Sequence, residues 1–99
     1  MEIERYLLDK GIKPHYRGFK QLAYAIELCQ KNEKYLQGFT KWLYPDIARD
    51  LNISQRQVER NIRDAIKFSG FEQSISEFVW RSIIEMRINK LKEKKKNGV

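Results

Sequence analysis

The segment from Tyr44 to Lys67 constrains this chain most, because two helical patterns meet there at a tight polar turn. In the second pattern, apolar residues recur at helical spacing on one side: Val58, Ile62, Ala65 and Ile66. The other side is mainly basic: Arg56, Glu59, Arg60, Arg63 and Lys67. A helix with an apolar back and an arginine-rich front, docked on a partner helix, is typical of a helix-turn-helix that binds DNA. We therefore interpret the chain as a DNA-binding module.

Local signals define both helices of this segment. Pro45 suits a first helical turn, where its missing N–H costs nothing. Asn52 tolerates the left-handed conformation of a turn, and Ile53 is expected to fill that turn from the inside. Ser54 with Gln57 forms a capping-box pattern, so the second helix should start after Ser54. The first helix is expected to direct three apolar residues inward: Ile47, Ala48 and Leu51.

The rest of the chain also has helical spacing. Helices are predicted from Ile3 to Lys10, from Phe19 to about Lys31, and from a cap at Ser74 to about Leu91. Between the second and third patterns, Thr40 is a candidate cap for a short helical turn. Four residues there are expected to add to the core: Leu36, Phe39, Trp42 and Leu43. No stretch alternates with a period of two, so we predict an all-α bundle of about five to six helices.

The last predicted helix has more apolar surface than a small domain usually buries. One row is expected to close the core: Phe78, Val79, Ile83 and Met86. A second row points elsewhere: Trp80, Ile84, Ile88 and Leu91. We interpret the second row as a homodimer interface used on DNA; the alternative is a core that extends further, with Tyr6 and Leu7 covering it. The predicted domain spans residues 1–91, and residues 92–99 form a basic tail predicted to be disordered.

Composition limits the remaining classes of function. A net charge of +7 favours a polyanionic partner. The single Cys29 excludes an internal disulfide, and no Cys/His spacing suits zinc, so neither metal nor cofactor is expected. The charged start and the lack of a long apolar run predict a cytoplasmic protein without membrane contact. No catalytic triad, carboxylate pair or phosphate-binding glycine loop is present, so we do not expect an enzyme.

Three motifs carry a resemblance to a known family. The first runs through Gly11-Ile12, His15, Arg17-Gly18 and Phe19, and the second is Leu43-Tyr44-Pro45-Asp46-Ile47-Ala48. The third is Val58-Glu59-Arg60 followed by Ile62-Arg63 and Ala65-Ile66. Together they resemble the DNA-binding output domain of the sporulation master response regulator, stage zero sporulation protein A, of spore-forming Firmicutes. The resemblance covers residues from about Ile3 to Lys67, and more weakly the last helix.

This resemblance implies a helical fold without a wing that binds a short TGTCGAA-like box through the major groove. It places Glu59, Arg60 and Arg63 on DNA. The chain departs from the family at Gln57, where Arg is usual, and at Asp64, where His is frequent; these positions bear on the preferred box. Ninety-nine residues leave no room for the receiver domain that precedes this module in the family, so control by phosphorylation is not implied.

The candidate DNA-binding residues lie along the predicted second helix and its cap: Ser54, Arg56, Gln57, Glu59, Arg60, Arg63, Asp64 and Lys67. The simplest alternative is a solvated helix face on which Glu59 pairs with Arg63 or Arg56. A Glu among DNA-facing arginines would be repelled by phosphates unless it met a base donor, which makes Glu59 informative.

The competing function is a protein-interaction module that caps a regulator or an RNA polymerase subunit. The short connector after Lys67 favours a repressor over an activator.

Overall fold

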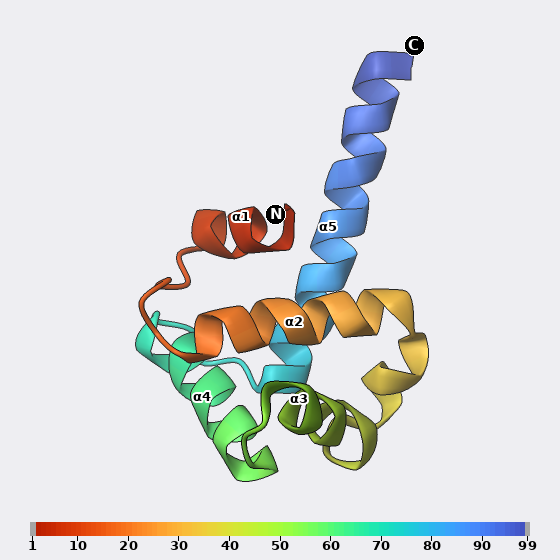
Figure 1. Ribbon diagram of the computed structural model, residues 1–99. Helices are drawn as coiled ribbons and strands as arrows, with labels where there is room; N and C mark the ends of the chain where they lie inside the picture. The colour runs from red at the N-terminus through yellow and green to blue at the C-terminus, as the bar shows by residue number, and fades with distance from the viewer. Residues whose placement is uncertain (1, 99) are drawn as a thin grey trace.

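A computed structural model describes residues 2–98 and folds them into five α-helices (Figure 1). Their bounds are α1 (Glu2–Lys10), α2 (Gly18–Lys31), α3 (Tyr44–Leu51), α4 (Gln55–Phe68) and α5 (Ile75–Gly98). A 3-10 helix, η1 (Glu33–Gln37), and a π-helix, η2 (Phe39–Leu43), connect α2 to α3. No strand occurs within residues 2–98, so the prediction of a small all-α bundle is confirmed.

Helix α2 lies at the centre of the bundle. It contacts α1 on one side and α3 and α4 on the other, and it also packs against α5 (Figure 1). The most deeply buried side chains come from all of these helices and from the segments between them: Leu7, Ile12, Leu22, Ile26, Leu43, Ile47, Ile62, Ile66 and Ile83. One continuous core therefore fixes the helix-turn-helix to the rest of the chain.

Two helices cross closely at Gly18, the first residue of α2. A Cβ atom at this position would lie 1.9 Å from the backbone oxygen of Asn61 in α4 and 2.9 Å from the backbone nitrogen of Ile62. Gly18 is therefore required by the space between two backbones. Gly11 is needed for a different reason: it ends α1 with a φ of +102°.

The turn between α3 and α4 has the predicted chemistry. Asn52 adopts the left-handed conformation (φ 56°), and the N–H of Ile53 donates to the carbonyl oxygen of Ala48 at 3.0 Å. Ile53 is half-buried beneath the turn, as expected. The prediction for Leu51 is wrong, because its side chain is 43% exposed. Helix α3 ends at Leu51, and the chain bends so that Ile53 packs against the core in its place.

The segment between α2 and α3 differs from its prediction. Thr40 is not a cap, because η2 is a π-helix whose N-cap position is occupied by Gly38. Leu36 and Leu43 are buried, as predicted, but Phe39 and Trp42 are only half-buried. The indole of Trp42 lies against Gly38, where a Cβ atom would approach a ring carbon to 2.8 Å. A π-helix of five residues offers only one short face to the core.

Helix α5 buries one of its two apolar rows. Phe78, Val79, Ile83 and Met86 are in the core, as predicted. The second row remains exposed, by 44% to 66%: Trp80, Ile84, Ile88 and Leu91. The alternative in which Tyr6 and Leu7 cover this row is therefore wrong. Leu7 is fully buried in the main core, and the hydroxyl of Tyr6 donates to Glu85 at 2.8 Å.

Helix α5 is also longer than predicted. It continues past Leu91 to Gly98, because the Lys- and Glu-rich segment contains good helix formers and no break before Gly98. Its C-terminal half extends away from the other helices, along the longest dimension of the molecule, 48 Å (Figure 1). The end predicted near Leu91 is therefore wrong. The predicted disorder of residues 92–99 stays a prediction, since the side chains from 94 onwards lie outside those described. Among residues 2–98, no helix has the length and hydropathy to cross a membrane.

Candidate nucleic-acid interface

Helix α4 separates its residues as the sequence predicted. The row against the core is buried: Val58, Ile62, Ala65 and Ile66. The opposite row is exposed and entirely basic: Arg56, Arg60, Arg63 and Lys67. These four recur every three or four residues, so their side chains leave the helix on the same side. The result is a cationic stripe along a helix that is held from behind by its apolar face.

The start of α4 is fixed by the predicted capping box. The Ser54 hydroxyl oxygen accepts from the backbone N–H of Gln57 at 3.1 Å, and the Ser54 N–H donates to Gln57 Oε1 at 3.5 Å. Both side chains are exposed, and both have a structural role in this state. Ser54 and Gln57 therefore set where the basic row begins.

Two acidic residues lie beside the basic row. Glu59 forms an ion pair with Arg63, one turn along the helix, rather than with Arg56. Within the described residues, neither Arg56 nor Arg60 takes part in an ion pair. Asp64 is half-buried at the edge of the row. Of the two pairings considered for Glu59, the structure therefore contains the one with Arg63. Arg56 and Arg60 keep their N–H donors available.

An open groove of about 800 Å³ follows one side of the stripe. Glu59, Arg63 and Lys67 of α4 form one wall. The rest of the lining includes Phe39 and Thr40 of η2, residues 70–74 of the connector after α4, and Ile75 and Ser76 at the start of α5. The groove connects the basic face of α4 with the segment that precedes α3.

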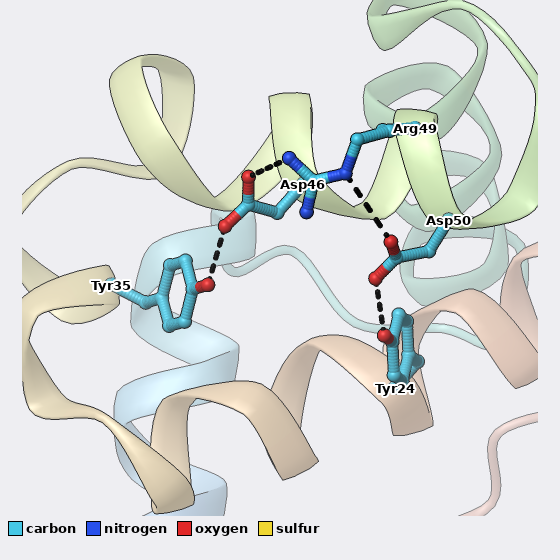
Figure 2. Close-up of polar contacts among 5 residues, drawn as sticks. All are labelled: Tyr24, Tyr35, Asp46, Arg49 and Asp50. Carbon is cyan, nitrogen blue, oxygen red and sulfur yellow. Dashed lines mark hydrogen bonds and ion pairs between the residues drawn. The ribbon is translucent and has the colours of Figure 1, made fainter.

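A chain of polar contacts positions α3, the other helix of the helix-turn-helix (Figure 2). The Tyr24 hydroxyl of α2 donates to Asp50 at 2.5 Å, and Arg49 lies 3.5 Å from the same carboxylate. Arg49 also donates to Asp46 at 3.0 Å, and Asp46 accepts from the Tyr35 hydroxyl of η1. The exposed side of α3 is thereby attached to both α2 and η1.

These contacts shift the acidities of their members. The hydrogen bond to Asp50, together with partial burial, raises the pKa of Tyr24 to about 12. The hydrogen bond from Tyr35 holds the pKa of Asp46 below its usual value, and the charge of Arg49 acts in the same direction. At neutral pH the two phenols are therefore protonated donors and the Asp46 carboxylate is a charged acceptor, which is the arrangement that its hydrogen bonds require.

One comparison with known protein families matches almost the whole chain. The model for "Sporulation initiation factor Spo0A C terminal" covers residues 3–99. The chain belongs to this family. The Spo0A C-terminal family is the DNA-binding domain of a sporulation transcription factor, so DNA binding and transcription regulation apply to this chain as a class of function.

The residues that the chain shares with the Spo0A C-terminal family have identifiable structural roles. Gly11 ends α1, Gly18 permits the α2–α4 crossing, and Phe19 is buried beside that crossing. In the Leu43–Ala48 motif, the buried members hold α3 in place: Leu43, Tyr44, Ile47 and Ala48. In the third motif, Glu59, Arg60 and Arg63 are the residues that the structure places outside the core.

Some parts of the site could not be predicted from the sequence. The groove beside α4 and the series of polar contacts that links Tyr24 to Tyr35 through α3 both depend on how distant segments pack. Both tyrosines are half-buried at the edge of the core. The sequence does contain one indication of this side of the groove: a basic residue, Lys41, next to an aromatic one, Trp42, just before the helix-turn-helix. The predicted dimer residues lie on α5 and are not part of this site. Among residues 2–98, no group of three or more His, Cys, Asp or Glu is placed to bind a metal ion.

Proposed function

We propose that this chain binds double-stranded DNA sequence-specifically, with α4 in the major groove. The supporting observation is the exposed basic row of α4, opposite a buried apolar row, in a chain of the Spo0A C-terminal family. A major groove about 12 Å wide accepts one α-helix. In this position Arg56, Arg60, Arg63 and Lys67 face base edges and phosphates.

Individual side chains have different roles in this proposal. Arg60 donates two hydrogen bonds to a guanine, and Glu59 accepts from the amino group of a cytosine. Glu59 is paired with Arg63 in the free protein, but exposed pairs one helical turn apart contribute only about 0.3–0.5 kcal/mol. Opening this pair therefore costs little compared with one base contact. Ser54, Gln57 and Asp64 lie at the ends and edge of the row and complete the proposed contact surface.

The proposal is tested by binding to a duplex that contains the TGTCGAA-like box and to a scrambled duplex, across a range of salt concentrations. Specific binding predicts a preference for the box that persists as salt rises, while affinity for both duplexes falls. Equal affinity for the two duplexes at every salt concentration would contradict sequence-specific binding. It would favour the alternative function, a module that binds a regulator or a polymerase subunit.

We propose that the chain represses transcription. Only residues 69–74 connect α4 to α5, so little chain is available beside the DNA-bound face to contact a polymerase. We expect a reporter promoter that carries the box to lose expression when this chain is present. The control is the same promoter with a scrambled box. An increase in expression from the box promoter alone would refute repression.

We propose that the exposed row of α5 joins two copies on DNA. Trp80, Ile84, Ile88 and Leu91 form a connected apolar strip, and such strips on monomers usually mark interfaces. We expect Ile84→Glu to abolish cooperative binding to a duplex with two boxes and to leave binding to a single box unchanged. Sedimentation with and without the two-box duplex measures this. If Ile84→Glu and the unmodified chain bind two boxes with equal cooperativity, the row does not join the two copies.

A further inference from the structure

A second basic surface lies just before the helix-turn-helix, where Lys34 and Lys41 flank the indole of Trp42. The Nζ atoms of Lys41 and Lys34 are 5.2 and 5.7 Å from the centre of the Trp42 ring system, within cation–π range. Both lysines are exposed. Within the described residues, neither ammonium group is in an ion pair, whereas Lys10 and Lys31 both are.

The ring of Trp42 packs against the backbone at Gly38, between η1 and η2. The backbone N–H of Trp42 donates to the Gly38 carbonyl oxygen at 2.8 Å, and the ring lies so close to Gly38 that a Cβ atom there would be 2.8 Å away. One face of Trp42 thus packs on the backbone, and the lysines lie over the ring. The patch formed by Lys34, Lys41 and Trp42 is therefore carried by η1 and η2.

The acidic residues around this patch are already paired. Asp46 accepts from Tyr35 and Arg49, and Glu33 accepts from Arg87 at 3.1 Å. Each of these carboxylates already accepts from another residue, and within the described residues neither forms an ion pair with Lys34 or Lys41. An anion is the partner that such a surface attracts.

The patch adjoins, in sequence, a residue that lines the groove beside the basic stripe of α4. Thr40, next to Lys41, lines the same groove as Glu59, Arg63 and Lys67. If α4 occupies a major groove, the sugar-phosphate strand at the edge of that groove passes along this side of the protein. We propose that Lys34, Lys41 and Trp42 form a second DNA contact, which binds backbone phosphates flanking the box. This inference rests on the proposed function of α4 and adds a flanking contact to it.

The salt dependence of binding tests the inference. Each phosphate contact adds about 0.9 to the slope of log affinity against log salt. Lys34→Gln/Lys41→Gln should therefore lower the slope by about 1.8, so that affinity falls about tenfold less than in the unmodified chain between 50 and 200 mM salt. The control, Lys90→Gln/Lys92→Gln, removes the same charge from the part of α5 that extends away from α4 (Figure 1). The control slope should stay closer to that of the unmodified chain.

Trimming the duplex locates the contact. We expect removal of base pairs on one side of the box to weaken the unmodified chain several-fold, and removal on the other side to have little effect. The lysine double variant should be insensitive to either trim. In a Trp80→Phe background, Trp42 is the only tryptophan, and its emission should change on the long duplex but not on the trimmed one.

Two results separate the failure of this inference from failure of the proposed function. Without a preference for the box in the unmodified chain, the proposed function fails and the second contact fails with it. If the box is preferred but the Lys34→Gln/Lys41→Gln and Lys90→Gln/Lys92→Gln variants share one slope and one response to trimming, only the second contact is wrong. Circular dichroism confirms that each variant is folded, which the exposure of all four lysines leads us to expect.

Discussion

Replacing Gly18 with alanine is expected to destabilise the domain by about 3 kcal/mol, at the upper end of the usual cost of overpacking. The added methyl group would meet the backbone oxygen of Asn61 at 1.9 Å. Because the obstacle is backbone, no rotamer change can relieve it, and α2 and α4 must separate along a buried surface. For a domain of this size, the loss corresponds to a fall in Tm of about 12–24 °C in thermal unfolding.

The direction of the stability change distinguishes a close backbone crossing from an ordinary helix position. Helix propensity alone predicts that Gly→Ala in a helix stabilises by up to about 1 kcal/mol. Gly38→Ala is the matched control, because its Cβ meets only the half-exposed side chain of Trp42, which can shift. We expect a loss of less than about 1 kcal/mol there. If Gly18→Ala is as stable as the unmodified chain, the backbones of α2 and α4 do not approach each other as closely as the structure shows.

Replacing Arg60 with alanine is expected to weaken binding to the box by about 1–3 kcal/mol, or roughly 5- to 150-fold. The preference at one base pair should be lost at the same time. The free energy of unfolding should change by less than about 0.5 kcal/mol, because Arg60 is exposed and outside the ion pairs of the described residues. Titration against duplexes with single base changes gives both the affinity and the position of the lost preference.

The matched control for Arg60 is Arg87→Ala on α5. It removes the same charge and breaks an exposed ion pair with Glu33, which should cost little stability. We expect it to weaken the box and a scrambled duplex slightly and equally. If Arg60→Ala also lowers affinity for both duplexes by the same factor, Arg60 contacts phosphates and not a base.

The elements of this fold were largely predictable because their signals are local. Asn52, Ser54 and Gln57 define the turn through their own hydrogen bonds and backbone preferences, and the structure reproduces them. The apolar spacing of α4 likewise needed no tertiary information. Leu51 could not be placed in this way, because whether it is buried depends on where α3 ends and on Ile53 replacing it.

The candidate site was only partly predictable, since its surroundings come from distant segments. The basic row of α4 follows from spacing, but the pairing of Glu59 with Arg63 was one of two open alternatives. The groove requires Thr40 to line the same space as Arg63, more than twenty positions away in the sequence. Such a juxtaposition is set by how α2 holds η1, η2 and α4 together, and no local pattern encodes it.

The crossing at Gly18 has a consequence for how this domain opens. Amide protons near Asn61 and Ile62 should exchange with solvent only when the whole domain unfolds, since α2 and α4 cannot separate there without losing the common core. The projecting end of α5 should exchange first. If α4 contacts DNA as proposed, a helix held in this way is already in its binding conformation before DNA arrives. Any control over it must therefore act by covering α4 or by moving the domain as a rigid unit, and not by refolding α4 itself.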